Sequence, residues 1–318
     1  MVEFSGLSPG IVRLGVAAAP RNGIISPYVR RLRLGAELRR LRERADLTGD
    51  FVADRMGWSA SKVSRIENAH TAPRPAEIQK LLLLYGIEGS YADELLALAQ
   101  EAKRKGWWKA YSDALPGPHT RFIGLEAEAT ATSVWSPEVV SGLLQAEDYA
   151  REVIKTSNGA APPGEVERRV EARMVRQQLL QRDPPFALTA VIDESVLMRR
   201  IGNEQVMTRQ LDRLLEVSEY PQLSLRILPL DGAHPIVAGG FILLQFGAVH
   251  EVTYHDVAYI EHVTDSLYIE AERDTFQYLN SFRRLNEAAL DKKASRERLA
   301  RARRDWELRK RSVHPSAS

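Results

Sequence analysis

Residues 47–69 constrain the fold more than any other stretch of the chain, and they read LTGDFVADRMGWSASKVSRIENA. Their apolar residues recur at helical spacing in two short runs: Leu47, Val52, Ala53 and Met56, then Val63 and Ile66. Gly57 lies between the runs, and glycine adopts the left-handed backbone conformation that ends a helix at little steric cost. The pattern therefore predicts two short helices joined by a tight turn.

The polar residues of this stretch predict where the helices begin and what the second one presents. Thr48 and Ser59 precede the two helices and suit the N-cap position. With Val63 and Ile66 facing inward, the outer face of the second helix is small, polar and basic: Ala60, Ser61, Lys62, Ser64 and Arg65. Such a face fits the major groove of DNA better than open water. We therefore expect a helix-turn-helix whose second helix reads DNA.

Charge is distributed unevenly along the 318 residues, although the formal net charge is only +2. Residues 26–90 carry 12 Lys and Arg against 8 Asp and Glu, and residues 291–318 carry 10 against 4. Residues 91–290 carry 20 against 29. The basic segment 26–90 is therefore expected to face nucleic acid, and the acidic segment 91–290 would repel it. Charge alone is equally compatible with solvated helix faces, so this observation supports the motif rather than replacing it.

Composition shifts and helix-breaking residues divide the chain into five segments. We expect a disordered lead, a helix-turn-helix domain, a connector helix, an α+β regulatory or dimerisation domain and a basic helical tail: 1–25, 26–90, 91–110, 111–290 and 291–318.

The two larger segments predict different fold classes. Residues 33–105 show five helical patterns, which predicts an all-α unit. The second half mixes helical segments with apolar runs that predict a sheet of four or five strands: FALTAVIDE, LSLRILPL, GGFILLQFG, EVTYHDVAYIE and DSLYIE. The chain is thus expected to be multidomain, all-α followed by α+β.

Composition also excludes several classes of protein. The absence of Cys excludes disulfides, a thiol nucleophile and a Cys-based zinc site, and it fits a reducing cytoplasm. No apolar run approaches the ~20 residues that span a bilayer, and the N-terminal segment has no signal-peptide pattern. We expect a cytoplasmic protein that does not contact membranes.

Two stretches of the chain resemble domains of a known protein family. The stretch from LGAELRRLRERADLTGDFVADRMGWSASKVSRIENA to LLLLYGI resembles an Xre (Cro/C1-like, lambda-repressor-like) helix-turn-helix domain. The blocks VVSGLLQAEDYA, VEARMVRQQLL, DESVLMRRIG, ILPLDGAHP and GGFILLQF are similar to a C-terminal domain attached to such helices in actinomycete regulators. The resemblance implies a transcriptional regulator whose C-terminal domain is regulatory or antitoxin-like, often encoded beside a small partner protein.

The resemblance also implies a set of DNA contacts. Those expected to touch bases are Ser59, Ala60, Ser61, Ser64 and Arg65, with Arg65 the main reader because its fork can bond guanine O6 and N7 together. Those expected to touch phosphates are Arg39, Arg40, Thr48, Lys62 and Arg74. Gly49 replaces the Gln that usually bonds a phosphate in this fold, so one side-chain contact is missing. Arg42 and Glu67 match a pair of positions that forms a salt bridge in this fold. We interpret this salt bridge as structural and not as a DNA contact.

Other residues raise the alternatives of an enzyme or a metal site. His250, His255 and His262 would alternate faces on a strand and match no metal-ligand spacing. The paired carboxylates Asp193–Glu194 and Glu126/Glu128 could perform acid–base chemistry, yet Asp–Glu at a strand–helix junction more often caps the helix. Aromatic residues could line a ligand pocket or pack the core: Trp107, Trp108, Tyr111 and Trp135. We expect no enzyme activity, no cofactor and no metal.

The sequence as a whole favours a sequence-specific transcriptional regulator. Its partners would be double-stranded DNA and a second copy of the chain, because tight binding by this fold normally needs paired half-sites. A small partner protein or a small-molecule effector would act on the C-terminal domain. The alternative is an antitoxin-like interaction module that sequesters a partner and binds DNA only for autoregulation.

Overall fold

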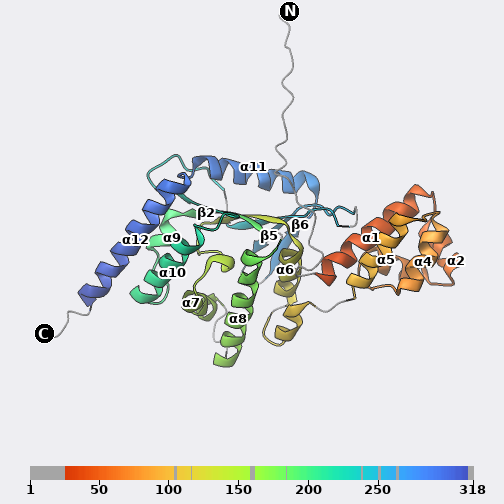
Figure 1. Ribbon diagram of the computed structural model, residues 1–318, viewed down its shortest axis with the longest axis horizontal. Coiled ribbons are helices and arrows are strands. Elements are labelled where there is room, and N and C mark those ends of the chain that lie inside the picture. Colours follow the sequence, from red (N-terminus) through yellow and green to blue (C-terminus); the bar gives the residue numbers. More distant parts are fainter. Residues whose placement is uncertain are drawn as a thin grey trace, which may run out of the picture.

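The computed structural model describes residues 26–313 apart from 104–105, 116, 158–161, 184, 238, 250–251 and 263–264. The predicted disordered lead, 1–25, and the end of the predicted tail, 314–318, lie outside the described residues. A helical head, residues 27–101, adjoins an α+β body formed by the rest of the chain (Figure 1). The predicted fold class, an all-α part followed by an α+β part, is confirmed.

The head contains five helices, α1 to α5: Pro27–Arg44, Gly49–Met56, Ala60–Glu67, Pro75–Leu84 and Ser90–Glu101. One buried cluster unites all five, with Leu38 of α1, Val52 of α2, Ile66 of α3, Ile78 of α4 and Leu98 of α5 each at most 3% exposed. Full burial of such side chains contributes roughly 1.5–3 kcal/mol each. The helix pair is therefore part of one packed unit.

Helix α1 belongs to two cores. The sequence pattern begins at about Arg33, but the helix starts at Pro27, where Ser26 caps it. Val29 packs in the core of the body, whereas Leu34, Leu38 and Leu41 pack in the core of the head. Because a single helix crosses the boundary without a break, it fixes the direction in which the head leaves the body.

The body is built on one six-stranded sheet in the order β3-β2-β1-β4-β5-β6. The strands β1 to β6 are Ala131–Ser136, Ala187–Asp193, Leu223–Leu228, Phe241–Gln245, Val257–Glu261 and Ser266–Ile269. β1, β2 and β3 are parallel to one another, while β4, β5 and β6 are joined by antiparallel pairing. The sheet is therefore mixed.

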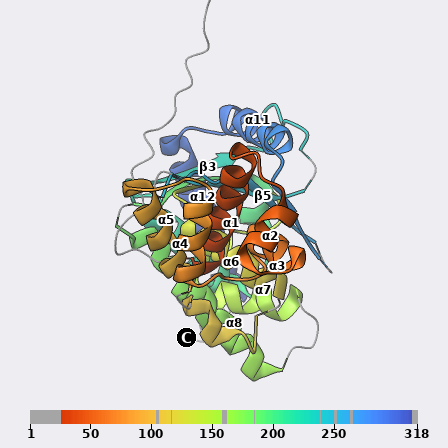
Figure 2. The same ribbon diagram turned by 90° about the vertical axis from the view of Figure 1, so that its right-hand side faces the viewer.

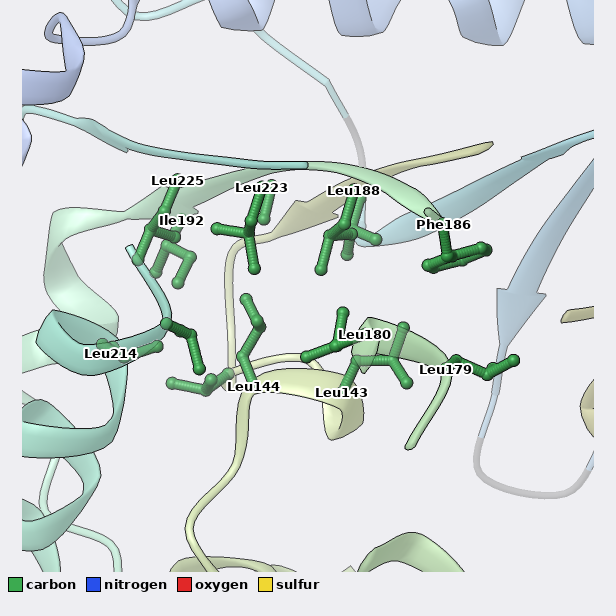
Figure 3. Packing of buried hydrophobic residues seen from close by; sticks show 14 of the residues in the cluster. Leu143, Leu144, Leu179, Leu180, Phe186, Leu188, Ile192, Leu214, Leu223 and Leu225 are labelled. Carbon is green, nitrogen blue, oxygen red and sulfur yellow. The ribbon is translucent and has the colours of Figure 1, made fainter. Parts of the chain in front are cut away.

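Helices cover both faces of the sheet (Figure 1). One face carries most of them: α6, η2, α7, α8, η3, α9 and α10, at Gly117–Glu128, Gly142–Leu144, Glu147–Ser157, Pro163–Arg176, Gln177–Gln181, Glu194–Met198 and Glu204–Val217, where η denotes a 3-10 helix. Leucines of η2 and η3 point at the sheet residues Leu188 and Leu223 across this layer (Figure 3). The opposite face is covered by α11, Glu272–Ala288. The last helix, α12, Lys292–Val313, lies at the end of the body away from the head.

Three elements differ from the sequence-based expectation. β1 was not predicted, because ATSVWS is short and lacks a continuous apolar run. The apolar spacing of residues 164–182 predicts one long amphipathic helix, but α8 ends at Arg176 and the 3-10 helix η3 follows it. The predicted connector at 91–110 is divided: α5 packs in the head, and the 3-10 helix η1, Trp107–Tyr111, packs against the body.

Candidate DNA-binding surface

The turn between α2 and α3 has the geometry that the sequence predicts. Gly57 ends α2 in the left-handed conformation at φ 65°, where a side chain would be strained. Thr48 Oγ1 accepts a hydrogen bond from the amide of Phe51 at 3.2 Å, and Ser59 Oγ accepts one from Lys62 at 3.2 Å. Both predicted N-caps are thus present. Figure 2 shows α2 and α3 on the end of the head that faces away from the body.

The outer face of α3 is open to solvent. Val63 and Ile66 are buried against the head, and the residues expected to contact bases are exposed: Ser59, Ala60, Ser61, Ser64 and Arg65. Within the described part of the chain, Arg65 forms no ion pair and no side-chain hydrogen bond. Its guanidinium is therefore free to donate to an acceptor outside the protein, as base recognition requires.

Three of the cations expected to contact phosphates are instead engaged by carboxylates. Arg39 bonds Glu43 at 2.8 Å, and Arg40 bonds Glu37 through two nitrogens. Lys62 Nζ lies 2.6 Å from Glu77, and 3.9 Å from the centre of the Trp58 ring. Each would have to exchange its carboxylate for a phosphate, so the free protein holds these cations in a neutralised state.

Glu77 is the residue that restrains Lys62. Burial raises the pKa of its carboxyl, but hydrogen bonds from Lys62 and from the Arg74 amide lower the pKa by more, so the group stays charged. The hydrogen bond from the Arg74 amide to Glu77 Oε2, at 2.7 Å, also caps α4. The Arg74 side chain itself is exposed and forms no ion pair among the described residues.

The prediction did not include Arg55, which lies on α2. Its side chain is exposed and has no carboxylate partner in the described part of the chain. In helix-turn-helix proteins the first helix of the motif crosses the DNA backbone, which is where a free cation is useful. The helical pattern could have identified it, because Val52 and Ala53 face the core and leave Arg55 on the outside.

The salt bridge between Arg42 of α1 and Glu67 of α3 holds the two helices together. Arg42 contacts Glu67 with two nitrogens, at 2.7 and 3.0 Å, and donates a third bond to the carbonyl of Leu47 at 2.8 Å. The helices meet closely at Gly35, where an added Cβ would lie 2.5 Å from the carbonyl oxygen of Glu67. This contact and the forked salt bridge together orient the recognition helix.

A buried ionic cluster joins the head to the body. Arg30 of α1 lies 3.0 Å from Glu101 and 2.8 Å from Glu128 of α6, which also accepts the Ser26 amide. Arg33 is fully buried and donates to the carbonyls of Gly247 and Val252 at 2.7 and 2.8 Å. Burial raises the pKa of Glu128, although Arg30 and Arg33 oppose that shift.

The head and the body also share apolar packing. Val249 and Val252, on the segment between β4 and β5, belong to the head's own core. The position of the head is therefore set by packing and by charge together.

The carboxylates considered for acid–base chemistry have structural partners. Asp193 caps α9 by accepting the Ser195 amide at 2.9 Å and also lies 2.8 Å from His234 Nε2. Glu126 forms an ion pair with Arg176 at 2.7 Å, as Glu128 does with Arg30. The two glutamates thus face different arginines.

The expected histidine and aromatic sites are not assembled in the described residues. No group of three or more His, Asp or Glu is placed to hold a metal ion there, and His250 lies outside them. His255 bonds Glu270 at 3.3 Å. Trp108 and Tyr111 pack on the face of the sheet that carries α6, whereas Trp135 packs under α11. A pocket lined jointly by these aromatic residues is therefore not formed.

Comparison with known proteins gives two matches, and neither a curated protein nor a solved structure is among them. A helix-turn-helix domain matches residues 33–95, which covers most of α1 and the helices α2 to α5 up to Leu95. A domain of unknown function, DUF5753, matches residues 119–301, from α6 into α12. No helix among the described residues is long and apolar enough to cross a membrane. Because the second match spans more than half of the chain, the protein belongs to the DUF5753 family and carries a helix-turn-helix domain in front of that domain.

Proposed function

We propose that the protein is a sequence-specific transcriptional regulator of the Xre type, acting on DNA in the cytoplasm. The observation that carries the proposal is the free guanidinium of Arg65 on the exposed face of α3, within a matched helix-turn-helix domain. A helix-turn-helix inserts its second helix into the major groove. Arg65 would bond a guanine, with Ser61 and Ser64 beside it and the Ala60 methyl suited to a thymine methyl.

Phosphate contacts would set the register of the head on DNA. Arg74 and Arg55 are available without rearrangement, because neither is paired with a carboxylate among the described residues. Lys62, Arg39 and Arg40 would join only after leaving Glu77, Glu43 and Glu37. The amide groups at the start of α2 can face a phosphate where Gly49 offers no side chain.

The proposed regulator binds as a homodimer, and its body carries regulation. One head covers few base pairs, so two heads on half-sites about one helical turn apart are needed for tight binding. The support is the rigid junction: α1 and the Arg30–Glu128 pair make the direction of α3 depend on the body. A change in the body can therefore alter the spacing of two recognition helices.

The test is to replace Arg65 with Ala and measure binding to an operator selected from random duplexes by the full-length protein. We expect a loss of roughly 1–3 kcal/mol, about tenfold to a hundredfold, and relaxed preference at one guanine. The matched control is Arg304→Ala, which removes an exposed arginine of α12 that has no ion pair among the described residues and belongs to the far end of the molecule. Unchanged sequence preference in Arg65→Ala would show that α3 does not read the bases as proposed.

A further inference from the structure

A small hollow lies between α9 and α12, on the part of the body most distant from the head (Figure 1). Its volume is about 90 Å³. Leu197, Met198, Ala302 and Trp306 form its apolar lining. Three arginines and two carboxylates complete the lining: Arg298, Arg301, Arg309, Glu194 and Asp305. Sites for drug-sized ligands usually measure ~300–1,000 Å³, so this hollow fits a single side chain rather than a nucleotide or a cofactor.

The hollow is held open by fixed contacts. Trp306 is 3% exposed, and its Nε1 donates to the carbonyl of Leu197 at 2.8 Å. Arg298 forms an ion pair with Glu194 of α9 at 2.5 Å. Met198, in contrast, is 49% exposed at the rim. A rigid floor with an exposed apolar rim suits the anchoring of an apolar side chain from another molecule.

The helix that forms one wall of the hollow is strongly basic, whereas the lining itself has three arginines against the carboxylates of Glu194 and Asp305. Helix α12 carries 10 Lys and Arg against 3 Asp and Glu. Arg301 is exposed, and within the described residues no carboxylate lies within ion-pair distance of it, although Asp305 is one turn away on the same helix. Arg309 stacks on Trp306, 4.6 Å from the ring centre. The rim therefore offers the Arg301 guanidinium to a negatively charged ligand.

Two other occupants fit this surface less well. A second copy meeting it through the same face would place the arginine-rich α12 against itself, and like charges in contact are unfavourable. Nucleic acid would satisfy the arginines but would leave Met198 and the Trp306 hollow without an apolar partner, since phosphate contacts need only cations.

We propose that the α9–α12 surface binds an acidic amphipathic segment of a partner protein. One apolar side chain of that segment would fill the hollow against Met198 and Trp306, and a carboxylate of the segment would pair with Arg301. Recognition would thus combine one apolar anchor in a pocket with a charge pair that supplies orientation. The surface lies at the other end of the molecule from α3, so it can be occupied while the head is on DNA (Figure 1).

The experiment uses the full-length protein and a displayed random-peptide library as the probe. We expect the enriched peptides to carry Asp or Glu around one Leu, Phe, Met or Trp. Synthetic copies should bind at least about tenfold more weakly to Arg301→Glu and to Met198→Asp, a difference of about 1.4 kcal/mol. Both substituted positions are exposed, so the variants should fold, and operator binding reports that the head is intact.

Arg304→Glu is the matched control, because Arg304 is an exposed arginine of the same helix that does not line the hollow and has no ion pair in the part of the chain that the structure describes. Peptides without an acidic and apolar bias, or peptides that bind all three variants as well as wild type, would overturn the proposal. It would also fail if Arg301→Glu converted a dimer to a monomer, which assigns the face to a second copy. Loss of nonspecific duplex binding in Arg301→Glu would assign the face to nucleic acid.

Discussion

At the residue scale, the head is organised by which of its cations are already paired. Arg65 and Arg74 have no carboxylate partner among the described residues, whereas Lys62 is bound by Glu77. A paired lysine contributes less to phosphate binding because the phosphate must displace a carboxylate of the same charge. In the free protein the available cations of this set are therefore Arg65, which is expected to read a base, and Arg74, which is expected to contact a phosphate.

Replacing Glu77 with Gln tests this competition. The amide can still cap α4, but Lys62 is released, and a negative charge facing the DNA is removed. We expect tighter operator binding and a steeper fall of log affinity with log salt, by about one unit of slope. Titrations over a range of salt concentrations measure both. Glu88→Gln, which neutralises an exposed glutamate of the head that has no ion pair with any described residue, should change the slope much less.

At the element scale, the position of α3 depends on its close approach to α1. The Arg42–Glu67 salt bridge is only partly exposed, at 13% and 9%, and it forms beside the glycine contact. Glycine is required there by space rather than by backbone angle, because the nearest neighbours of an added Cβ are rigid backbone atoms of Ile66 and Glu67. The two helices cannot keep this distance with a larger residue.

Gly35→Ala should therefore separate α1 from α3 and destabilise the head by roughly 1–3 kcal/mol, the usual effect of overpacking. Denaturant unfolding followed by a probe in the head measures the loss, and operator binding should weaken with it. Gly49→Ala is the matched substitution, since nothing lies within 4 Å of its added Cβ. Equal stability of the two variants would contradict the close-approach argument.

At the scale of the whole molecule, the head and the body behave as one unit because charge and packing cross their boundary. Arg30 and Glu128 are nearly inaccessible, with side chains 4% and 3% exposed. Removing one member of a buried pair leaves the other charge without compensation, which typically costs about 3–5 kcal/mol. The same change removes a link that orients the recognition helices.

We expect Arg30→Met to weaken the junction selectively. Wild type should unfold in one transition, while the variant should show the head opening first, as faster hydrogen exchange in α2 and α3 than in the body sheet. Arg30→Met combined with Glu128→Leu should recover much of the stability, because the buried carboxylate is removed with its partner and the remaining carboxylate, Glu101, is 27% exposed. Uniform acceleration of exchange throughout both parts would indicate a general loss of stability instead of uncoupling.

The sequence by itself determined the local structure of the head. Apolar spacing, Gly57 and the caps at Thr48 and Ser59 act within a few residues, so they predict α2, the turn and α3. The β-rich half of the body could be predicted as strands but not as a sheet with its order, because parallel pairing joins segments such as β1 and β2 that are far apart in the chain. β1 itself was missed because ATSVWS is short and lacks a continuous apolar run.

Only the tertiary structure decided which charged residues are free. The pairing of Lys62 with Glu77 and of Arg30 with Glu128 joins residues on different helices, and burial sets the strength of those pairs. The same holds for the α9–α12 hollow, whose walls come from two helices about a hundred residues apart. Sequence spacing describes one helix at a time, whereas an ion pair or a pocket depends on how helices pack together.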